Sequence, residues 1–220
     1  MLLESELRSR LRKLSPASIY GPFSRFVAFK HLVSSRKGQS TAEPRPLWGI
    51  GSVEGGGRFN PPHKFEVIYL AEDPVTALKE VEMVFAPSAG QVVRVQHIPI
   101  VHVSILGILL RAADLTDETN QSLLGTTEQE LTGEWRFTQA EGREAPTQLL
   151  GRAIFQQGDF DAIRYPSSKN RGGICVAVFP ERLSQSSIYV YDPDGNLAQQ
   201  IPAPLKSLEG GKPARRLRSR

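Results

Sequence analysis

The chain has 220 residues, of which 40% are hydrophobic and 23% are charged, a composition typical of a soluble globular domain rather than a disordered or fibrous chain. Its single cysteine, Cys175, excludes an internal disulfide framework and any metal site built from several cysteines. The N-terminus is too charged for a secretory signal, and no stretch approaches the roughly 18 apolar residues that span a membrane. We therefore expect a cytoplasmic protein without membrane contact.

The formal net charge of +4 is concentrated in residues 206–220, which contain six basic residues and one acidic residue. Residues 1–205 then carry a net charge of −1, which does not favour a nucleic-acid-binding surface. The tail is rich in Gly, Pro and Arg and has too few apolar residues to form a core. We interpret it as basic and disordered, with a dedicated nucleic-acid arm as the alternative, and predict no direct nucleic-acid contact.

In chain order, residues 3–13 have leucines spaced along one face of a short helix, within an N-terminal helical extension over residues 1–19. This stripe predicts packing onto the domain, with a docking site for a partner as the alternative. Residues 34–46 are polar and contain proline, which predicts a loop. The Gly-rich residues 48–62 must turn tightly, and residues 66–71 have the apolar composition of a buried strand.

Asp73 is suited to the N-cap of a helix over residues 74–85, whose first position is proline. Residues 91–111 are rich in Val and Ile and predict two strands separated near Pro99. The acidic residues 115–145 predict a short helix with long loops.

A further helix is predicted for residues 146–157, which begin with proline and are followed by a glycine. Residues 161–165 and 174–179 predict two strands joined by a polar turn, and Asp-Pro-Asp-Gly at residues 192–195 predicts the turn of a last hairpin. The mixture of short strands and helices indicates one compact α+β domain over residues 20–205.

Two common nucleotide-binding motifs and a paired-histidine metal site are absent from the sequence. Gly49 and Gly51 begin a pattern like a Rossmann fingerprint, but Glu54 stands where the third glycine belongs, and no helix is predicted to follow. No Gly-Lys-Ser/Thr run forms a P-loop. The histidines are not paired at metal-binding spacing, and we predict structural roles for His97 and His102 and no metal.

Three residues stand out on physical grounds. Arg58 follows three glycines, which let a backbone approach a ligand, and its guanidinium suits phosphate oxygens; a surface arginine in a turn is the alternative. Tyr69 lies in an otherwise apolar strand, where a core role with a satisfied hydroxyl is the alternative. Glu80 lies at the edge of the apolar arc of its helix, which suits a functional carboxylate or a solvated boundary residue.

Residues 55–82, GGGRFNPPHKFEVIYLAEDPVTALKEVE, resemble the signature of the RES-domain family. In that family a glycine-flanked arginine before an aromatic-Asn-Pro run leads to a Tyr-Leu-Ala strand, and a helix carrying a glutamate follows. Here eleven positions lead from Arg58 to Tyr69 and eleven from Tyr69 to Glu80, which agrees with the family pattern. A thinner resemblance covers residues 20–180.

The resemblance implies further site residues at matching positions. The family has an earlier arginine flanked by aromatic residues, which best matches Arg25, with Arg45 as its rival. The family's serine matches Ser167 in the Tyr-Pro-Ser run, with Ser168 second. In some members the functional hydroxyl lies nearer the start of the preceding helix, where this chain has Thr147.

The resemblance also implies a fold like that of ADP-ribosyltransferases, with mixed and antiparallel sheets flanked by helices. It implies a toxin of a type II toxin–antitoxin module that breaks the nicotinamide–ribose bond of NAD⁺, with NAD⁺ as substrate and no other cofactor. The implied partner is a cognate antitoxin with a DNA-binding domain. The implied catalytic residues are Glu80, Tyr69 and Ser167, and the implied NAD⁺-binding residues are Arg25, Arg58, Asn60 and Thr147.

The ribosyl acceptor stays open at this point. Water would make the protein an NAD⁺ glycohydrolase, inorganic phosphate a phosphorylase, and a protein acceptor an ADP-ribosyltransferase. An alternative of another class is a catalytically inactive RES-like binding module. The presence of Arg58, Tyr69 and Glu80 together argues against that alternative.

Overall fold

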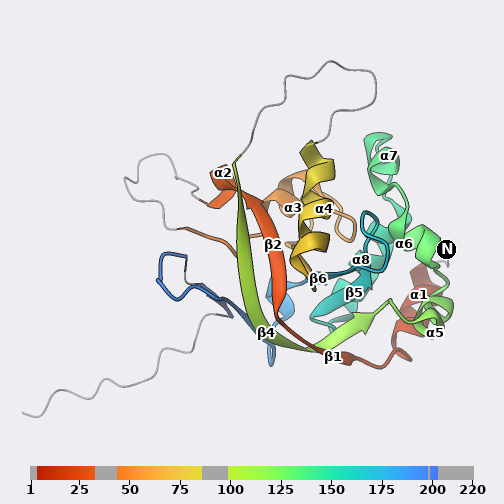
Figure 1. The fold of residues 1–220 in the computed structure, drawn as a ribbon. Coiled ribbons are helices and arrows are strands. Elements are labelled where there is room, and N and C mark those ends of the chain that lie inside the picture. The colour runs from red at the N-terminus through yellow and green to blue at the C-terminus, as the bar shows by residue number, and fades with distance from the viewer. Residues whose placement is uncertain (1–3, 33–43, 86–98, 198, 203–220) are drawn as a thin grey trace, which may run out of the picture.

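The computed structural model describes residues 4–32, 44–85, 99–197 and 199–202 (Figure 1). The helices are α1 (Glu4–Leu11), α2 (Phe29–Leu32), α3 (Ile50–Gly55), α4 (Pro74–Phe85), α5 (Glu118–Leu124), α6 (Glu128–Thr132), α7 (Trp135–Ala140) and α8 (Pro146–Gln157), with a 3₁₀ turn at Pro180–Arg182. The strands are β1 (Ala17–Tyr20), β2 (Phe23–Ala28), β3 (Ile68–Ala71), β4 (Ile100–Asp114), β5 (Ala162–Pro166), β6 (Ile174–Val178), β7 (Ser187–Val190) and β8 (Gln200–Ile201).

The long strand β4 organises one mixed sheet. Its first half pairs antiparallel with β2, and further along it pairs with β1 and β7. Its last residues, Ala112–Asp114, pair parallel with β5. Because β5 continues through β6 and β3 back to β2, the sheet curls round until it closes on β4. A mixed sheet with flanking helices confirms the expected α+β class.

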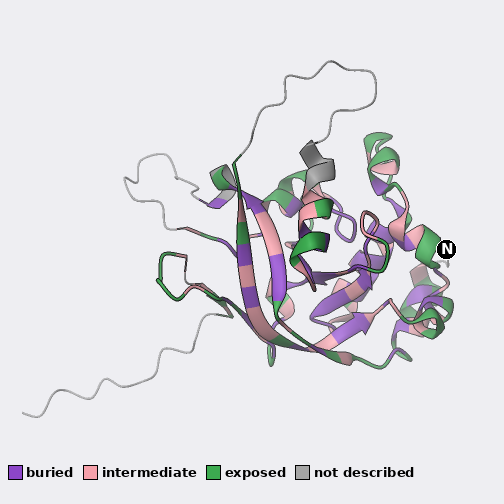
Figure 2. Cartoon of the chain, viewed as in Figure 1, coloured by how far each residue is buried: buried purple, intermediate pink, exposed green. Residues whose placement is uncertain are grey.

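The curled sheet separates two hydrophobic cores, and strand alternation decides which side chain enters which core. In β3, Ile68 and Leu70 join the core between the two halves of the sheet, whereas Tyr69 and Ala71 face the core under the helices. Most residues of β5 and β6 are buried and none is exposed (Figure 2), and their buried side chains alternate between these two cores. This alternation directs Tyr69 toward the helical side, where α4 packs over β2, β3 and β6.

The two longer helices are confirmed at their predicted bounds. Asp73 caps α4, because its Oδ1 accepts the Thr76 N–H at 2.8 Å. The helix α8 covers residues 146–157 and ends at Gly158, whose φ of 83° is the left-handed conformation that glycine adopts most readily. The predicted strands over 66–71, 161–165 and 174–179 correspond to β3, β5 and β6, and the turn at 192–195 joins β7 to β8.

Two sequence predictions are corrected. Residues 115–145 contain three short helices, α5 to α7, instead of one helix with long loops. A six-residue helix, α3, follows Gly49, where no helix was expected. The missing third glycine still excludes a Rossmann fingerprint.

Several predictions fall partly or wholly outside the described residues. The second predicted strand of the 91–111 region is β4, which runs on to Asp114, whereas the first lies outside them, as do most of the 34–46 loop, His97 and the basic tail over 206–220. His102 has Nε2 3.2 Å from Ser24 Oγ and its ring near Phe26, which fits the predicted structural role. Within the described ranges, no helix is both long and apolar enough to cross a membrane.

Candidate active site

A cavity lies between α4, the Gly-rich turn before β3 and the helical side of β2 and β3. Its volume of about 420 Å³ suits a small-molecule ligand. Residues distant in the sequence meet there, because α7 and the turn between β5 and β6 close its remaining sides. Its lining residues include Arg25, Arg58, Tyr69, Glu80, Trp135, Arg136, Tyr165, Ser168, Lys169 and Cys175. Arg58, Tyr69 and Glu80, which the sequence singled out, therefore share one cavity.

Glu80 is held at the cavity by the turn that follows β5. Its Oε1 accepts a hydrogen bond from Ser167 Oγ at 2.6 Å and another from the Ser168 N–H at 3.0 Å. Ser167 Oγ is itself fixed, since it accepts the N–H groups of Lys169 and Asn170. Both hydrogen bonds reach Oε1, and Oε2 of Glu80 has no hydrogen-bond partner in the described part of the chain. Oε2 is therefore available to a ligand.

Ser167 therefore holds the Glu80 carboxylate by a hydrogen bond without contacting the cavity. It is 8% exposed and does not line the cavity itself, whereas Ser168 does. Thr147, the alternative hydroxyl, is buried near the start of α8 and lies neither on the cavity wall nor within hydrogen-bond distance of Glu80. The structure thus brings Ser167, and not Thr147, to the carboxylate.

Tyr69 presents its ring to the cavity while its hydroxyl is used within the protein. The hydroxyl donates to Asn60 Oδ1 at 2.8 Å and accepts the Phe59 N–H at 2.9 Å. Burial raises the pKa of Tyr69, so the phenol stays protonated. Its ring, rather than its hydroxyl, is the part left for a ligand.

Asn60 is fully buried and does not line the cavity, in contrast to its expected role in substrate binding. Its amide nitrogen donates to the Ser52 and Phe65 carbonyls, and its oxygen accepts from Tyr69. Gly57 must lack a side chain here, because a Cβ atom would stand 2.6 Å from Asn60 Oδ1 and against the Tyr69 ring. Asn60 and Gly57 thus fix the Gly-rich turn and place Tyr69.

Arg58 lies at the cavity with its donors largely engaged. Its Nη1 donates to the carbonyls of Leu131 and Gly133, at 2.7 and 2.8 Å, and its Nη2 donates to Ser168 Oγ at 3.0 Å. The guanidinium therefore joins the end of α6 to the turn that holds Glu80. Its buried charge contributes a positive potential to the cavity.

Arg25, not Arg45, is the earlier arginine that reaches the cavity. Nη1 and Nη2 of Arg25 donate to the carbonyls of Pro46 and Trp48, each at 3.0 Å. Burial lowers the pKa of Arg25 to about 10, and the Glu66 carboxylate opposes this shift. Arg45 is exposed, stacks over Trp48 and does not line the cavity.

The sequence did not identify the contribution of α7. Trp135 and Arg136 line the cavity, and the Arg136 guanidinium lies 4.4 Å from the centre of the Trp135 ring. The signal available was a tryptophan, one of only two in the chain, within an otherwise polar segment. Cys175 also lines the cavity, but burial raises the pKa of its thiol, which disfavours the reactive thiolate.

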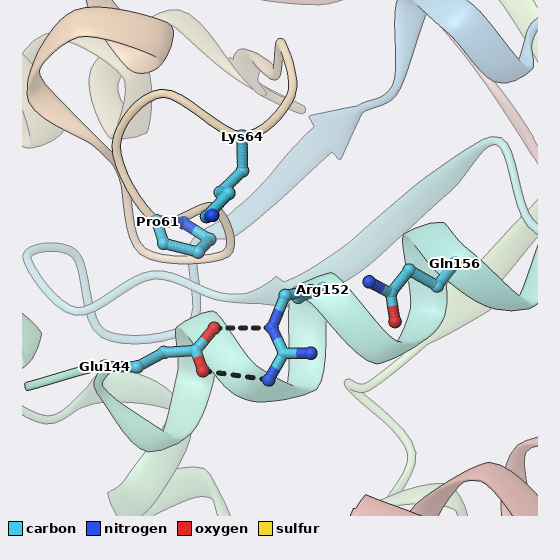
Figure 3. Close-up of a pocket in the computed structure, with 5 residues that line it drawn as sticks. All are labelled: Pro61, Lys64, Glu144, Arg152 and Gln156. Carbon is cyan, nitrogen blue, oxygen red and sulfur yellow. Dashed lines mark hydrogen bonds and ion pairs between the residues drawn. The ribbon is translucent and has the colours of Figure 1, made fainter.

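A second cavity, of about 430 Å³, lies on the outer side of α8 (Figure 3). It contains none of the residues singled out in the sequence, and its arginine, Arg152, is bound at both ends of its guanidinium by Glu144, at 2.8 and 2.9 Å. Glu4 lies 3.3 Å from the same guanidinium, so the positive charge is already compensated. The cavity beside Glu80 is therefore the candidate active site.

A metal centre finds no support in the described ranges, where no group of three or more His, Cys, Asp or Glu side chains is arranged to hold an ion. The chemistry available at the candidate site is that of one carboxylate with a free oxygen, an aromatic ring and several cations. Such a site suits a ligand that has anionic groups near the cations and develops positive charge at an atom near the carboxylate.

Comparison with known proteins adds a family and a fold. A family model described as RES domain matches residues 33–200, which include Arg58, Tyr69 and Glu80 and begin after Arg25. Among solved structures, a chain from the M. tuberculosis MbcT–MbcA toxin–antitoxin complex is similar, with a TM-score of 0.58 and 18% sequence identity. The match covers 89% of this chain and 91% of that chain, so the likeness extends over the whole fold. No curated protein matches the sequence.

Proposed function

The chain belongs to the RES domain family, and from this premise we propose that it is an enzyme that breaks the nicotinamide–ribose bond of NAD⁺. The observation that carries the proposal is the carboxylate of Glu80, which lines the cavity, is fixed through Oε1 by Ser167 and Ser168, and has no hydrogen bond at Oε2 from the described residues. A fixed carboxylate in a cavity of this size is the group that such a bond cleavage requires.

The proposed reaction follows the charge that develops on the ribose. As the bond from the anomeric carbon to the nicotinamide nitrogen breaks, its electron pair leaves with nicotinamide, and the ribose becomes cation-like, as in glycoside hydrolysis. Glu80 stabilises this positive charge through Oε2 without needing to rearrange, because Ser167 already holds Oε1 at 2.6 Å. The acceptor oxygen then attacks the anomeric carbon and releases its proton.

The remaining lining groups suit the rest of the substrate. The ring of Tyr69 offers an apolar face for nicotinamide or ribose, since its hydroxyl is occupied by Asn60 and Phe59. Arg25 and Arg58 supply positive potential for the pyrophosphate, and their hydrogen bonds to backbone carbonyls fix the walls of the cavity. In this proposal NAD⁺ is the substrate, and no additional cofactor takes part.

We further propose that the protein is the toxin of a toxin–antitoxin pair. The similar solved chain comes from a toxin–antitoxin complex, and it shares the fold of this protein over most of its length. The partner would be a cognate antitoxin with a DNA-binding domain, so any contact with DNA would be made through that partner. A protein ADP-ribosyltransferase toxin is the second candidate, because the same cavity would serve a protein acceptor.

The test is the release of nicotinamide from NAD⁺ by the purified protein, followed by chromatography in three conditions: buffer alone, buffer with inorganic phosphate, and buffer with a cell protein extract. Release of nicotinamide is the expected result, and release in buffer alone identifies a glycohydrolase. Release that needs phosphate identifies a phosphorylase, and release that needs protein identifies a transferase. No release in any condition, from protein shown to be folded, overturns the proposal in favour of a binding module.

A further inference from the structure

Four cationic side chains line the cavity, and they differ in what their nitrogens already bind. Arg25 and Arg58 each donate from both terminal nitrogens to protein acceptors. Lys169 lies 3.3 Å from the carboxylate of Glu134. Arg136 has no hydrogen bond or ion pair with any part of the chain that the structure describes, although its guanidinium lines the same cavity. The N–H groups of the Arg136 guanidinium are therefore free to donate two hydrogen bonds to one ligand.

The guanidinium of Arg136 is placed by its neighbour. It lies 4.4 Å from the centre of the Trp135 ring, and Trp135 is itself only 9% exposed. A cation over the face of a buried indole is held in position, which reduces the freedom that binding would otherwise remove. The residue is exposed overall and also lines the cavity, so a ligand that comes from solvent can reach it.

Arg58 is the other cation that acts on Arg136 within this cavity. Burial lowers the pKa of Arg136 and the charge of Arg58 lowers it further, while the carboxylates of Glu134 and Glu80 oppose the shift. The two guanidinium groups therefore repel each other across the cavity. A bound anion would relieve that repulsion, and a planar guanidinium suits two oxygens of one phosphate.

We propose that Arg136 is the residue that binds the phosphate groups of the dinucleotide, while Arg58 acts as a positioning residue for α6 and the turn holding Glu80. This assignment rests on the proposed function, which supplies NAD⁺ as the ligand. It differs from the expectation that Arg25 and Arg58 grip the pyrophosphate directly, since the terminal nitrogens of both already donate to the protein.

The experiment measures binding without turnover, in the background of E80Q, by calorimetric titration with two probes. NAD⁺ carries the phosphates, and nicotinamide riboside lacks them. R136A should weaken NAD⁺ binding by about 10- to 100-fold, the usual effect of losing a charge-assisted hydrogen-bonding partner, and leave the affinity for nicotinamide riboside unchanged. R136K should bind NAD⁺ with an intermediate affinity, because lysine keeps the charge without the two-pronged geometry.

The matched control is R143A, which removes an exposed arginine that pairs with Glu141 just beyond α7 and does not line the cavity. Its affinity for NAD⁺ should equal that of the E80Q background. An R136A variant that keeps full NAD⁺ affinity, or that loses affinity for both probes equally, would overturn the assignment while leaving the proposed function standing. An E80Q protein that binds no NAD⁺ at all would overturn the proposed function, and the phosphate assignment with it.

Discussion

The position of one side chain, Glu80, depends on two hydrogen bonds that come from a turn far away in the sequence. Ser167 contributes its hydroxyl and Ser168 its backbone N–H, and both reach the same oxygen. The two serines are therefore not equivalent: only the hydroxyl of Ser167 can be removed by substitution, whereas the N–H of Ser168 survives any change of its side chain except proline. Ser168 Oγ instead accepts from Arg58.

Replacing Ser167 by alanine should lower kcat about tenfold, which corresponds to about 1.4 kcal/mol in the barrier, and leave KM nearly unchanged. The carboxylate would keep its Ser168 N–H contact and lose the 2.6 Å bond that fixes its orientation. Steady-state kinetics of nicotinamide release measure both constants. S167T should restore part of kcat, because it restores the hydroxyl. If S167A changes KM and leaves kcat at the wild-type value, Ser167 does not position the carboxylate.

The sequence singled out residues that share a cavity, but not all the partners that hold them there. Arg58, Tyr69 and Glu80 share one cavity as expected, since their spacing follows a local pattern. Asn60 and Thr147 are buried and do not line the cavity, and the side chain of Asn60 instead bonds to groups of nearby residues in the chain. The spacing of residues does not show which polar side chains are used inside the protein and which reach a cavity.

The helix α4 carries Glu80, and its first turn is fixed by Asp73. The carboxylate of Asp73 accepts both the N–H and the hydroxyl of Thr76. These hydrogen bonds lower the pKa of Asp73 below its ordinary value of 3.8. Because the ionised form is favoured in the fold, its contribution to stability is complete above pH 3.8 and is lost as the pH falls through the lowered pKa.

The substitution D73A should reduce the free energy of unfolding by about 1 kcal/mol at neutral pH, the usual effect of losing a helix N-cap. Urea denaturation of the wild type and the variant, repeated at decreasing pH, measures the difference. We expect this difference to shrink once the pH is below 3.8, where the wild-type carboxylate becomes protonated. A difference that stays constant or grows on acidification would show that the carboxylate does not act as this cap.

The elements found from sequence are those with strong local signals. The helix α8 begins with proline and ends at Gly158, and both ends were predicted. The caps of the short helices α5 and α6 were present in the sequence, since Asp117 and Thr127 each accept a backbone N–H of the first turn.

The N-terminal helix α1 packs against the rest of the molecule as part of its hydrophobic core. Leu7 and Leu11 of α1 are 0% and 1% exposed and belong to the same cluster as the residues beneath α8. Glu4 and Arg8 add an ion pair to Arg152 and a hydrogen bond to Gln156 on the surface of α8. The residues that match the family model begin only at position 33, so α1 contributes to the core of this protein from outside that match.

The substitution L7A should destabilise the protein by about 2–5 kcal/mol, because it removes a fully buried leucine and leaves a cavity. The exposed Arg12, which follows the last residue of α1, serves as the control, and R12A should change stability by less than about 0.5 kcal/mol. Urea denaturation of both variants gives the comparison. If L7A is as stable as R12A, α1 is an appendage and not part of the core.

The closure of the sheet is the feature that sequence patterns could not supply. The strand β4 pairs with β1, β2, β5 and β7, and three of these pairings join residues more than fifty positions apart. The sequence predicted β4, β5 and a last hairpin, but it did not identify β1 and β2, and the register and order of all the strands depend on the packing of both cores. The candidate site forms where this closed sheet meets α4 and α7, which explains why α7 was recognised only from the structure.

The most direct test of the account is the rate of nicotinamide release from NAD⁺ by E80Q compared with the wild type. Glutamine keeps the shape of the side chain and an oxygen for Ser167 but removes the negative charge, so the rate should fall about 100-fold or more with the fold intact. E54Q, which changes an exposed glutamate on α3 outside the cavity, should react like the wild type. An E80Q protein that releases nicotinamide at the wild-type rate would contradict the central claim that Glu80 stabilises the ribosyl cation.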